Sequence, residues 1–523
     1  MGLRMSAQAT FSGGGARGRF RAFETVAACG PLAIFLVALG GATVGFFLWY
    51  TALTHFGASA LADGAGLAVA IPAGLLLTFA AWYLYGGYFS RRSGIGVVTA
   101  MRWDALSWAL LSAYALGLVI PAGWATPSHA AALAAALFAL TKILVAARFV
   151  HTVRDVLITF VVTRISIIVI AELASIVIAQ RPGTHVAESA NPLLAVWGRW
   201  DAVHYLDISQ RGYYGTDMAF FPLYPALIHL VGIFVGSDLI AGLIISNVAL
   251  FFGLLFFYKL VEHQYTRAVA HRAIFYVSIF PTAVFFSAVY TESLFFALTV
   301  ASFYYIREHK WVTAGIIGAF AAMTRSEGVL LFVPFAIEVA LAAQAAGFTH
   351  FFGHRRRVAR IVAGALAIPA GLAAYMAWLW VLRGDPLYFS HVQAHWNRKL
   401  APPWVSFTHA FTVISKGLRT HSTLTVANQS IELAFTVLMI AVLVAACWRL
   451  RPSYTAYMAL SIIVPMSTSS LMSMPRFALV LFPMFTLLAV WGGRSWVNSA
   501  IVAFSLPLLG LFTVLFADWY WVA

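Results

Sequence analysis

Long apolar runs with almost no charged residue dominate this chain of 523 residues. Hydrophobic residues make up 62% of the sequence and charged residues only 10%, whereas about a quarter of the residues in soluble globular proteins are charged. This composition excludes a soluble enzyme, a disordered chain and an ordinary nucleic-acid-binding protein. Because about 20 apolar residues cross a bilayer as one helix, we predict an all-α polytopic membrane protein.

Apolar windows between polar breaks predict about fifteen membrane-spanning helices. The windows lie near residues 30–50, 66–88, 105–122, 130–147, 156–179, 239–258, 273–290, 294–306, 311–323, 329–346, 361–382, 431–449, 454–471, 477–492 and 497–516. The first four form a block with almost no acidic or polar residue at membrane depth. We therefore predict a basic tail over 1–22, an accessory four-span module over 23–150 and the main membrane domain over 151–523.

The positions of Lys and Arg predict the orientation of the chain in the cell membrane. With the N-terminus in the cytoplasm, about two thirds of the 33 basic residues fall on short cytoplasmic turns. The two long connections, at about 180–238 and 383–430, then lie on the extracytoplasmic face, where binding or catalysis is expected. The sequence lacks a phosphate-binding glycine motif of the GxxxxGK[ST] type, so a cytoplasmic nucleotide site is not predicted.

Acidic, basic and aromatic residues gather at 197–214, at the start of the first long loop. In a helix, Asp201, His204 and Tyr205 share one face, and the two tryptophans of the segment are typical of an interfacial helix at headgroup depth. The prolines at 222 and 225 predict an extended or turned backbone after it. The alternative interpretation is an aromatic belt with a surface ion pair.

Two further polar turns are predicted to lie below the outer surface of the bilayer. Residues 273–306 span about 51 Å as helix, less than the roughly 60 Å of two crossings, and the same holds for 311–346. Ionisable groups at such depth need a polar environment, so Glu292, Arg325 and Glu327 are predicted to mark an outward-open cavity. The alternative for Glu292 is a buried pair with Arg325 that only holds helices together.

Three basic or titratable sites could bind ligands in this cavity. A guanidinium at the start of a helix, as at Arg325, favours a phosphate. Arg476 either binds the same anion or extends toward the lipid surface. His391 and His395 have the spacing of a metal pair on a helix, but no acidic residue nearby completes the site. We expect these histidines to contact the acceptor or a lid, and we expect no metal or other cofactor.

The ordered motifs resemble the GPI mannosyltransferase II (PIG-V) family and its bacterial relatives. The matching segments are 200–205, 212–213, 220–225, 290–293, 324–326 and 473–477. The resemblance covers about 156–523 and excludes the first four spans. It implies a GT-C membrane glycosyltransferase core. The apolar windows give this core about eleven spans and place a block of about four spans before it. It also implies an extracytoplasmic active site with a sugar donor carried on polyprenyl phosphate.

By this resemblance Asp201 is the general base of an inverting transfer of a mannosyl or other hexosyl residue to an acceptor hydroxyl. We expect donor-phosphate contacts from Arg325, Arg211 and Arg476. Contacts with the sugar or the acceptor are expected from His204, Tyr205, Tyr224, Glu292, Glu327, His391 and His395. Glu327 departs from the family pattern, which has Asn there. The expected partners are the polyprenyl-phosphate donor, membrane lipids and a glycan or glycolipid acceptor, with no nucleic acid.

Two other functions are compatible with a chain of this composition. A flippase or transporter of lipid-linked sugars would have broken or charged helices near the bilayer midplane, reachable from both sides. Here the polar motifs lie on one side only, which favours the transferase. A non-catalytic scaffold is the second alternative, and the intact segment around Asp201 argues against it.

Overall fold

The computed structural model describes residues 24–26, 28–56, 64–114, 127–181, 189, 191–396 and 398–522. Within these ranges every assigned element is a helix, and seven helices are long and apolar enough to cross a membrane. The prediction of an all-α polytopic membrane protein is confirmed. The predicted basic tail over 1–22 lies outside the described residues.

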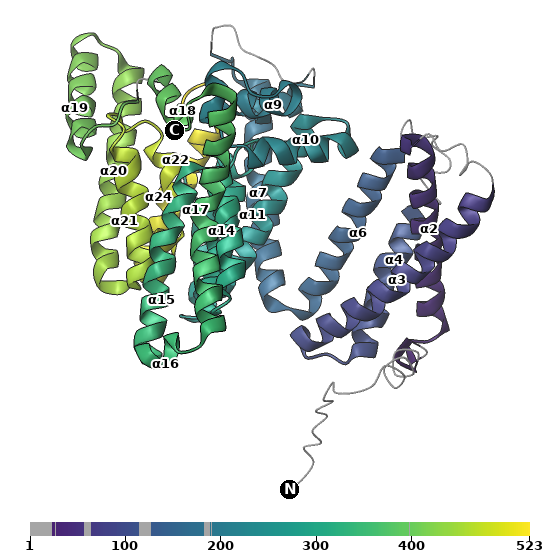
Figure 1. The fold of residues 1–523 in the computed structure, drawn as a ribbon. Coiled ribbons are helices and arrows are strands. Elements are labelled where there is room, and N and C mark those ends of the chain that lie inside the picture. The colour runs from purple at the N-terminus through teal and green to yellow at the C-terminus, as the bar shows by residue number, and fades with distance from the viewer. Residues whose placement is uncertain are drawn as a thin grey trace. The chain divides into compact units, whose positions relative to one another are not determined.

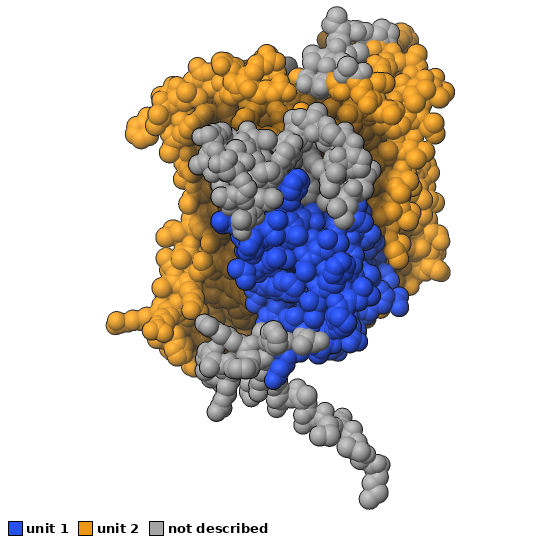
Figure 2. All heavy atoms as spheres, turned by 90° about the vertical axis from the view of Figure 1, so that its right-hand side faces the viewer, with its two compact units in different colours: residues 1–154 blue, residues 155–523 orange. Residues whose placement is uncertain are grey.

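The chain divides into two compact units, Met1–Arg154 and Asp155–Ala523 (Figure 2). Unit 1 has long helices at the places of the four predicted spans (Figure 1). They are α2 (Pro31–Phe56), α3 (Gly64–Ser93), α4 (Val97–Tyr114) and α6 (Pro127–Phe149). α2 and α3 approach so closely that a Cβ atom on Gly74 would lie 2.4 Å from the backbone nitrogen of Gly45.

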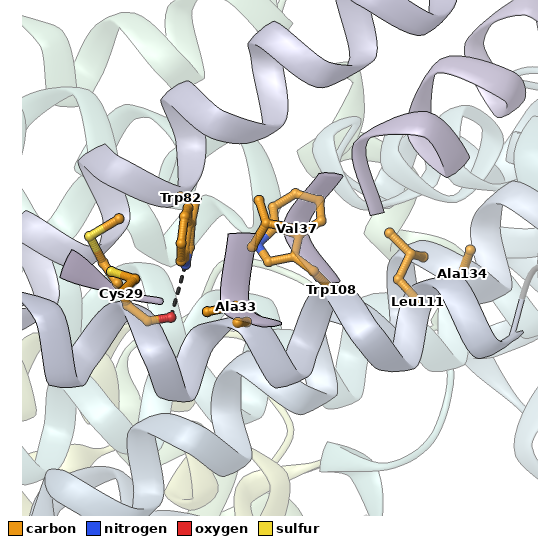
Figure 3. Packing of buried hydrophobic residues seen from close by; sticks show 9 residues of the cluster. Cys29, Ala33, Val37, Trp82, Trp108, Leu111 and Ala134 are labelled. Atoms are coloured by element: carbon orange, nitrogen blue, oxygen red, sulfur yellow. Dashed lines mark hydrogen bonds between the residues drawn. The ribbon is translucent and has the colours of Figure 1, made fainter. Parts of the chain in front are cut away.

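Unit 1 has a hydrophobic core of its own, built around Trp82 (Figure 3). The indole Nε1 of Trp82 donates a hydrogen bond of 2.9 Å to the carbonyl oxygen of Met101, so its one polar atom is satisfied. The block is less apolar inside than the sequence indicated, because Asp104 on α4 is fully buried and pairs with Lys142 on α6. Opposite charges on two helices compensate each other there.

Unit 2 contains the remaining helices, and α7 begins just before it. They are α7 (His151–Val177), α8 (Pro192–Ala195), η3 (Val196–Gly198), α9 (Asp201–Arg211), η4 (Gly215–Ala219), α10 (Leu223–Val235), α11 (Asp238–Glu262), α12 (Arg267–Ser278), η5 (Ala283–Phe286), α13 (Glu292–Arg307), α14 (Trp311–Thr324), η6 (Ser326–Leu331), α15 (Phe332–Ala346), α16 (Phe348–Phe352), α17 (Arg355–Arg383), α18 (Tyr388–His391), η7 (Val392–Trp396), α19 (Pro403–Arg419), α20 (Thr423–Arg449), α21 (Pro452–Met466), α22 (Met474–Leu479), α23 (Phe482–Trp491) and α24 (Ser495–Ala517).

The predicted span at 273–290 is wrong, because the chain leaves the helix after Ser278. Pro281 has no N–H group and cannot continue the hydrogen-bond ladder. Arg164 on α7 compensates the break by donating to the carbonyl oxygens of Ser278 at 2.8 Å and Ala283 at 2.9 Å. A buried arginine thus holds an irregular segment together inside unit 2.

Two other predicted boundaries shift for similar reasons. The span expected at 477–492 is divided between α22 and α23. In the proline segment after 219 the backbone is extended at Phe220, with φ −97° and ψ 131°, and turns at Pro222, so that α10 begins at Leu223. Pro225 lies in the first turn of α10, where its missing N–H removes no hydrogen bond.

Candidate active site

Asp201 is the first residue of α9 and follows a strained backbone position. Trp200 has a positive φ of 58°, an uncommon conformation for a bulky residue that needs support from its surroundings. The Tyr290 hydroxyl supplies this support. It accepts the backbone N–H of Asp201 at 3.2 Å and donates to the carbonyl oxygen of Arg199 at 3.1 Å. The loop before α13 therefore sets the position of the Asp201 carboxylate.

The Asp201 carboxylate forms an ion pair with Arg476 of α22. Oδ2 of Asp201 accepts from Nη1 of Arg476 at 2.7 Å, and the Asp201 side chain remains 23% exposed. Burial raises the pKa of this carboxyl, but the Arg476 guanidinium outweighs burial and holds the pKa below its usual value. Asp201 is therefore ionised at neutral pH and able to accept a proton.

Glu292 links the same arginine to a second one. Its Oε1 lies 3.1 Å from Nε of Arg476 and accepts from Nη1 of Arg325 at 2.8 Å. Nε of Arg325 also lies 3.7 Å from Oε2 of Glu327. The Glu292 side chain is only 1% exposed, so the structure favours the buried pair that was the alternative interpretation of this residue.

A cavity of about 760 Å³ opens beside the Asp201 carboxylate. The sequence-predicted residues that line it are Asp201, His204, Tyr205, Arg325, Glu327 and Arg476. They come from α9, from the turn after α14, from η6 and from α22. The structure thus brings together, in one hollow, residues that lie far apart in the sequence.

His204 is held in a fixed orientation at the cavity wall. Its Nδ1 lies 2.8 Å from Oδ1 of Asp217, and its ring stacks on Phe220 with centroids 4.5 Å apart. A carboxylate on one ring nitrogen fixes the orientation of the imidazole and leaves the other nitrogen for a ligand. Asp217 was not among the predicted site residues, and its nearness in sequence to His204 was the available signal.

Three predicted residues, Glu292, Tyr224 and Arg211, are not among those that line the cavity. Tyr224 is fully buried in α10, where its hydroxyl lies 2.7 Å from Oγ of Ser246 on α11. It holds two helices together. Arg211 has a side chain 70% exposed and donates to Asp207 one turn away at 2.6 Å. The predicted contact of Arg211 with the donor phosphate has no support in this geometry.

The two histidines of the second long loop lie beside the cavity without lining it. His391 is paired with Asp385 at 2.7 Å, an acidic partner that the sequence did not reveal. His395 packs edge-on against Trp396, which does line the cavity. In the described ranges no group of three or more His, Cys, Asp or Glu side chains is placed to hold a metal ion.

Sequence reasoning left two cations of the second loop out of the site. Arg398 and Lys399 both line the cavity. Nη2 of Arg398 donates to the carbonyl oxygen of Met472 at 2.9 Å, and burial lowers the pKa of this guanidinium. Together with Arg325 and Arg476 they make four lining cations against the two lining carboxylates of Asp201 and Glu327. Glu292 compensates part of this charge, because it contacts both Arg325 and Arg476. Arg398 and Lys399 therefore give the second-loop side of the cavity its positive charge, which favours an anion.

Glu432 on α20 was also missed, although an acid in an apolar helix is itself a functional signal. Its two carboxylate oxygens accept the backbone N–H groups of Ser473 at 3.0 Å and Met474 at 2.9 Å. These N–H groups begin α22, where a negative charge is favoured. Glu432 thereby positions the helix that carries Arg476.

Aromatic residues from the last segment of the chain close one side of the site. Trp521 lines the cavity and packs against Trp200 with centroids 5.3 Å apart. Trp519 packs against Trp200 as well, at 5.6 Å. No local pattern in the sequence indicates that residues about 320 positions apart meet there, because their contact depends only on how unit 2 folds.

Comparison with known proteins gives one family match. Residues 138–368 match the model of a family described as mannosyltransferase (PIG-V). No curated protein matches the chain. The matched segment contains Asp201, Glu292 and Arg325 but ends before Arg398, Glu432 and Arg476. The resemblance read from the sequence is confirmed over this segment.

Proposed function

We propose that the chain is a membrane mannosyltransferase, because residues 138–368 match the model of the mannosyltransferase (PIG-V) family and seven helices are long and apolar enough to cross a membrane. The donor is mannose carried on polyprenyl phosphate. The acceptor is a hydroxyl group of a glycan or glycolipid. The observation that supports this proposal best is one cavity in which an ionised carboxylate, Asp201, faces an excess of cations.

The donor phosphate binds to the cations of the cavity. Arg398 and Lys399 are available on the second loop, and Arg476 is shared with Asp201. Arg325 is 11% exposed and is neutralised by Glu292, so it acts mainly by holding that side of the cavity. Guanidinium groups bind phosphate with two parallel hydrogen bonds. These bonds are stronger in a site with little water.

The transfer step is an inverting displacement. The acceptor oxygen forms a bond to C1 of mannose, the bond between C1 and the phosphate oxygen breaks, and its electron pair leaves with polyprenyl phosphate. The proton of the acceptor hydroxyl moves to a carboxylate oxygen of Asp201. The positive side chains stabilise the negative charge that develops on the leaving phosphate, which is the kind of term that contributes most to catalysis.

Binding of the donor also makes Asp201 a better base. In the structure Arg476 lowers the pKa of Asp201 and so weakens its basicity. A donor phosphate that attracts Arg476 shares the positive charge of this guanidinium. The pKa of Asp201 then rises toward the pKa of a buried carboxyl without a partner, and the base is activated only when the donor is in place.

The test is transfer of labelled mannose from polyprenyl-phosphate mannose by the purified protein in detergent. Asp201→Asn keeps the shape of the side chain and removes the base, so kcat is expected to fall about 10²- to 10⁴-fold. The matched control is Asp207→Asn on the same helix, which loses only its surface pair with Arg211 and should keep nearly full activity.

The same assay separates the alternatives. A flippase would be favoured if the native protein moved lipid-linked sugar across a vesicle membrane but transferred no sugar to an acceptor. Equal rates of transfer by the native protein and Asp201→Asn would show that Asp201 is not the general base. We also propose that transfer is independent of metal ions, since arginine and lysine supply the positive charge, and that it survives an excess of chelator. Activity that is lost with chelator and restored by one divalent metal would contradict this.

The proposed active face is extracytoplasmic. The support is the concentration of Lys and Arg on the opposite set of turns, which favours the cytoplasm. A single cysteine at exposed Lys416 of α19, in a variant in which Cys29 and Cys447 are replaced by Ser, tests the orientation. An impermeant thiol reagent applied to intact cells should label it, and labelling only after lysis would reverse the orientation.

A further inference from the structure

Unit 2 has a second cavity, of about 890 Å³, at the end remote from Asp201. Helix α17 connects the two ends. It begins beside the second cavity at Arg355 and ends at Arg383, just before the loop that lines the first one. At about 1.5 Å per residue it is roughly 43 Å long, enough to cross a bilayer. Figure 1 shows α16 at one end of this unit and α9 and α18 at the other.

Arginines dominate the wall of this second cavity. Those that line it are Arg307, Arg356, Arg357, Arg360 and Arg451. Among the described lining residues Glu338 is the only acid. An excess of about four positive charges around one hollow attracts an anion.

The one lining carboxylate, Glu338, is already paired with two of the arginines. Glu338 accepts two hydrogen bonds of 3.0 Å from Arg451 and one of 3.3 Å from Arg307. These three residues form a fixed base of the cavity. Arg356 and Arg360, one turn apart on α17, have exposed side chains with no ion pair to any described residue. Their charges remain available to a ligand.

The cavity also has an apolar side. Leu341, Ala342 and Ala345 of α15 line it. Beside it, Phe348 and Phe352 of the short helix α16 are 57% and 43% exposed. Exposed phenylalanines next to arginines are typical of a membrane surface, where rings enter the lipid and charges meet headgroups. A ligand with a phosphate and an apolar part matches both sides.

We propose that this cavity binds the phosphate of an acidic phospholipid headgroup, with the acyl chains along the apolar side of α15. Arg356 and Arg360 contact the phosphate, and Arg357 closes the wall, since its Nη1 donates to the carbonyl oxygen of Phe351 at 3.2 Å. The first turn of α17 has no side-chain cap, so its free N–H groups add to the attraction. Basic pockets between membrane helices bind acidic headgroups in this way.

The test measures lipid binding to the full-length protein in a neutral detergent. Dioleoylphosphatidylglycerol is the probe, dioleoylphosphatidylcholine is the neutral lipid, and inorganic phosphate is the free anion. Retained lipid is counted by native mass spectrometry, and the melting temperature is followed in parallel. The variant is R356Q/R360Q. The matched control is R355Q/R449Q, which removes two exposed arginines that do not line the cavity.

We expect phosphatidylglycerol to bind to the native protein and to the control. Two arginines at about 1 kcal/mol each correspond to a loss of about 30-fold in affinity for R356Q/R360Q. Equal losses in the variant and the control would overturn the proposal, because only general surface charge would then be involved. Equal binding of phosphatidylcholine would also overturn it, as would inorganic phosphate that raises the melting temperature as much as the acidic lipid. Should the double variant misfold, the single variants R356Q and R360Q replace it. Each is expected to lose part of the affinity for phosphatidylglycerol, and unchanged affinity in both would overturn the proposal.

Discussion

Arg476 contacts both Asp201 and Glu292 and is almost enclosed by them. It is only 12% exposed, and its two carboxylate neighbours raise its pKa well above the usual value despite burial. A guanidinium in this position controls the proton affinity of Asp201 and also supplies charge for a phosphate. The same residue therefore connects donor binding with the strength of the base.

Replacement of Arg476 by Gln should move the acid limb of activity to higher pH. The folded pKa of Asp201 lies below 3.8 because the guanidinium favours the charged carboxylate. Without Arg476, burial dominates and raises the pKa of the Asp201 carboxyl, so activity is lost earlier as the pH falls. The measurement is the pH profile of kcat/KM for residual mannosyl transfer.

Arg211→Gln is the control for this profile, because Arg211 lies outside the cavity and, among the described residues, has its ion pair with Asp207. Its acid limb should coincide with that of the native protein. An acid limb that stays in place in Arg476→Gln would show that Arg476 does not set the pKa of Asp201.

Among the elements, α22 decides the geometry of the site although it is only six residues long. A helix this short is not stable by itself. Ser473 before it has a positive φ of 72°, and Glu432 holds the first two N–H groups. The contact between α20 and α22 is therefore what fixes the direction of Arg476.

Glu432→Ala should loosen α22 and reduce transfer. Two buried N–H groups lose their acceptor, which costs about 2–5 kcal/mol of stability, and Arg476 is no longer held against Asp201. Thermal unfolding and the transfer assay are the measurements. Glu432→Gln keeps one acceptor oxygen and should be intermediate.

Ser430→Ala on the same helix is the control, since Ser430 is exposed. Its melting temperature and its rate of mannosyl transfer should equal those of the native protein. A Glu432→Ala protein with full activity and normal KM would mean that Arg476 is positioned by its acidic neighbours alone.

On the scale of the whole molecule, the residues that line the Asp201 cavity all belong to unit 2. Unit 1 has its own core around Trp82 and its own buried ion pair between Asp104 and Lys142. The family match begins at residue 138, within α6, and covers little of unit 1. The two units are therefore expected to respond separately to mutation.

Trp82→Ala should destabilise unit 1 and leave catalysis intact. The change removes a fully buried side chain and costs about 3 kcal/mol or more. Limited proteolysis should detect cleavage in 1–154 at a lower temperature, while kcat/KM stays within about twofold. Leu84→Ala on the same helix, with its side chain 68% exposed, is the control. A parallel loss of transfer would show that unit 1 supports the active site.

Apolar periodicity was sufficient for the class of protein, and isolated charged motifs predicted several residues that line one cavity. The long helices α7, α11, α17, α20 and α24 lie where windows of low charge predicted spans. Asp201, His204, Tyr205, Arg325 and Arg476 were predicted from the rarity of ionisable residues in such a chain and from the family resemblance, and all five line the cavity. These signals are local, because an apolar window or a charged motif can be recognised from a short stretch of sequence.

The partners of those residues were decided by tertiary structure alone. Asp201 and Arg476 are 275 positions apart, yet they form the central ion pair. The break at Pro281 is stabilised by Arg164, a distant residue on α7. Tyr224 and Arg211 had suitable chemistry in a suitable segment, but packing turned one into the interior and the other outward. An ion pair depends on a contact of a few ångströms, and no periodicity along a chain encodes which distant side chain will make that contact.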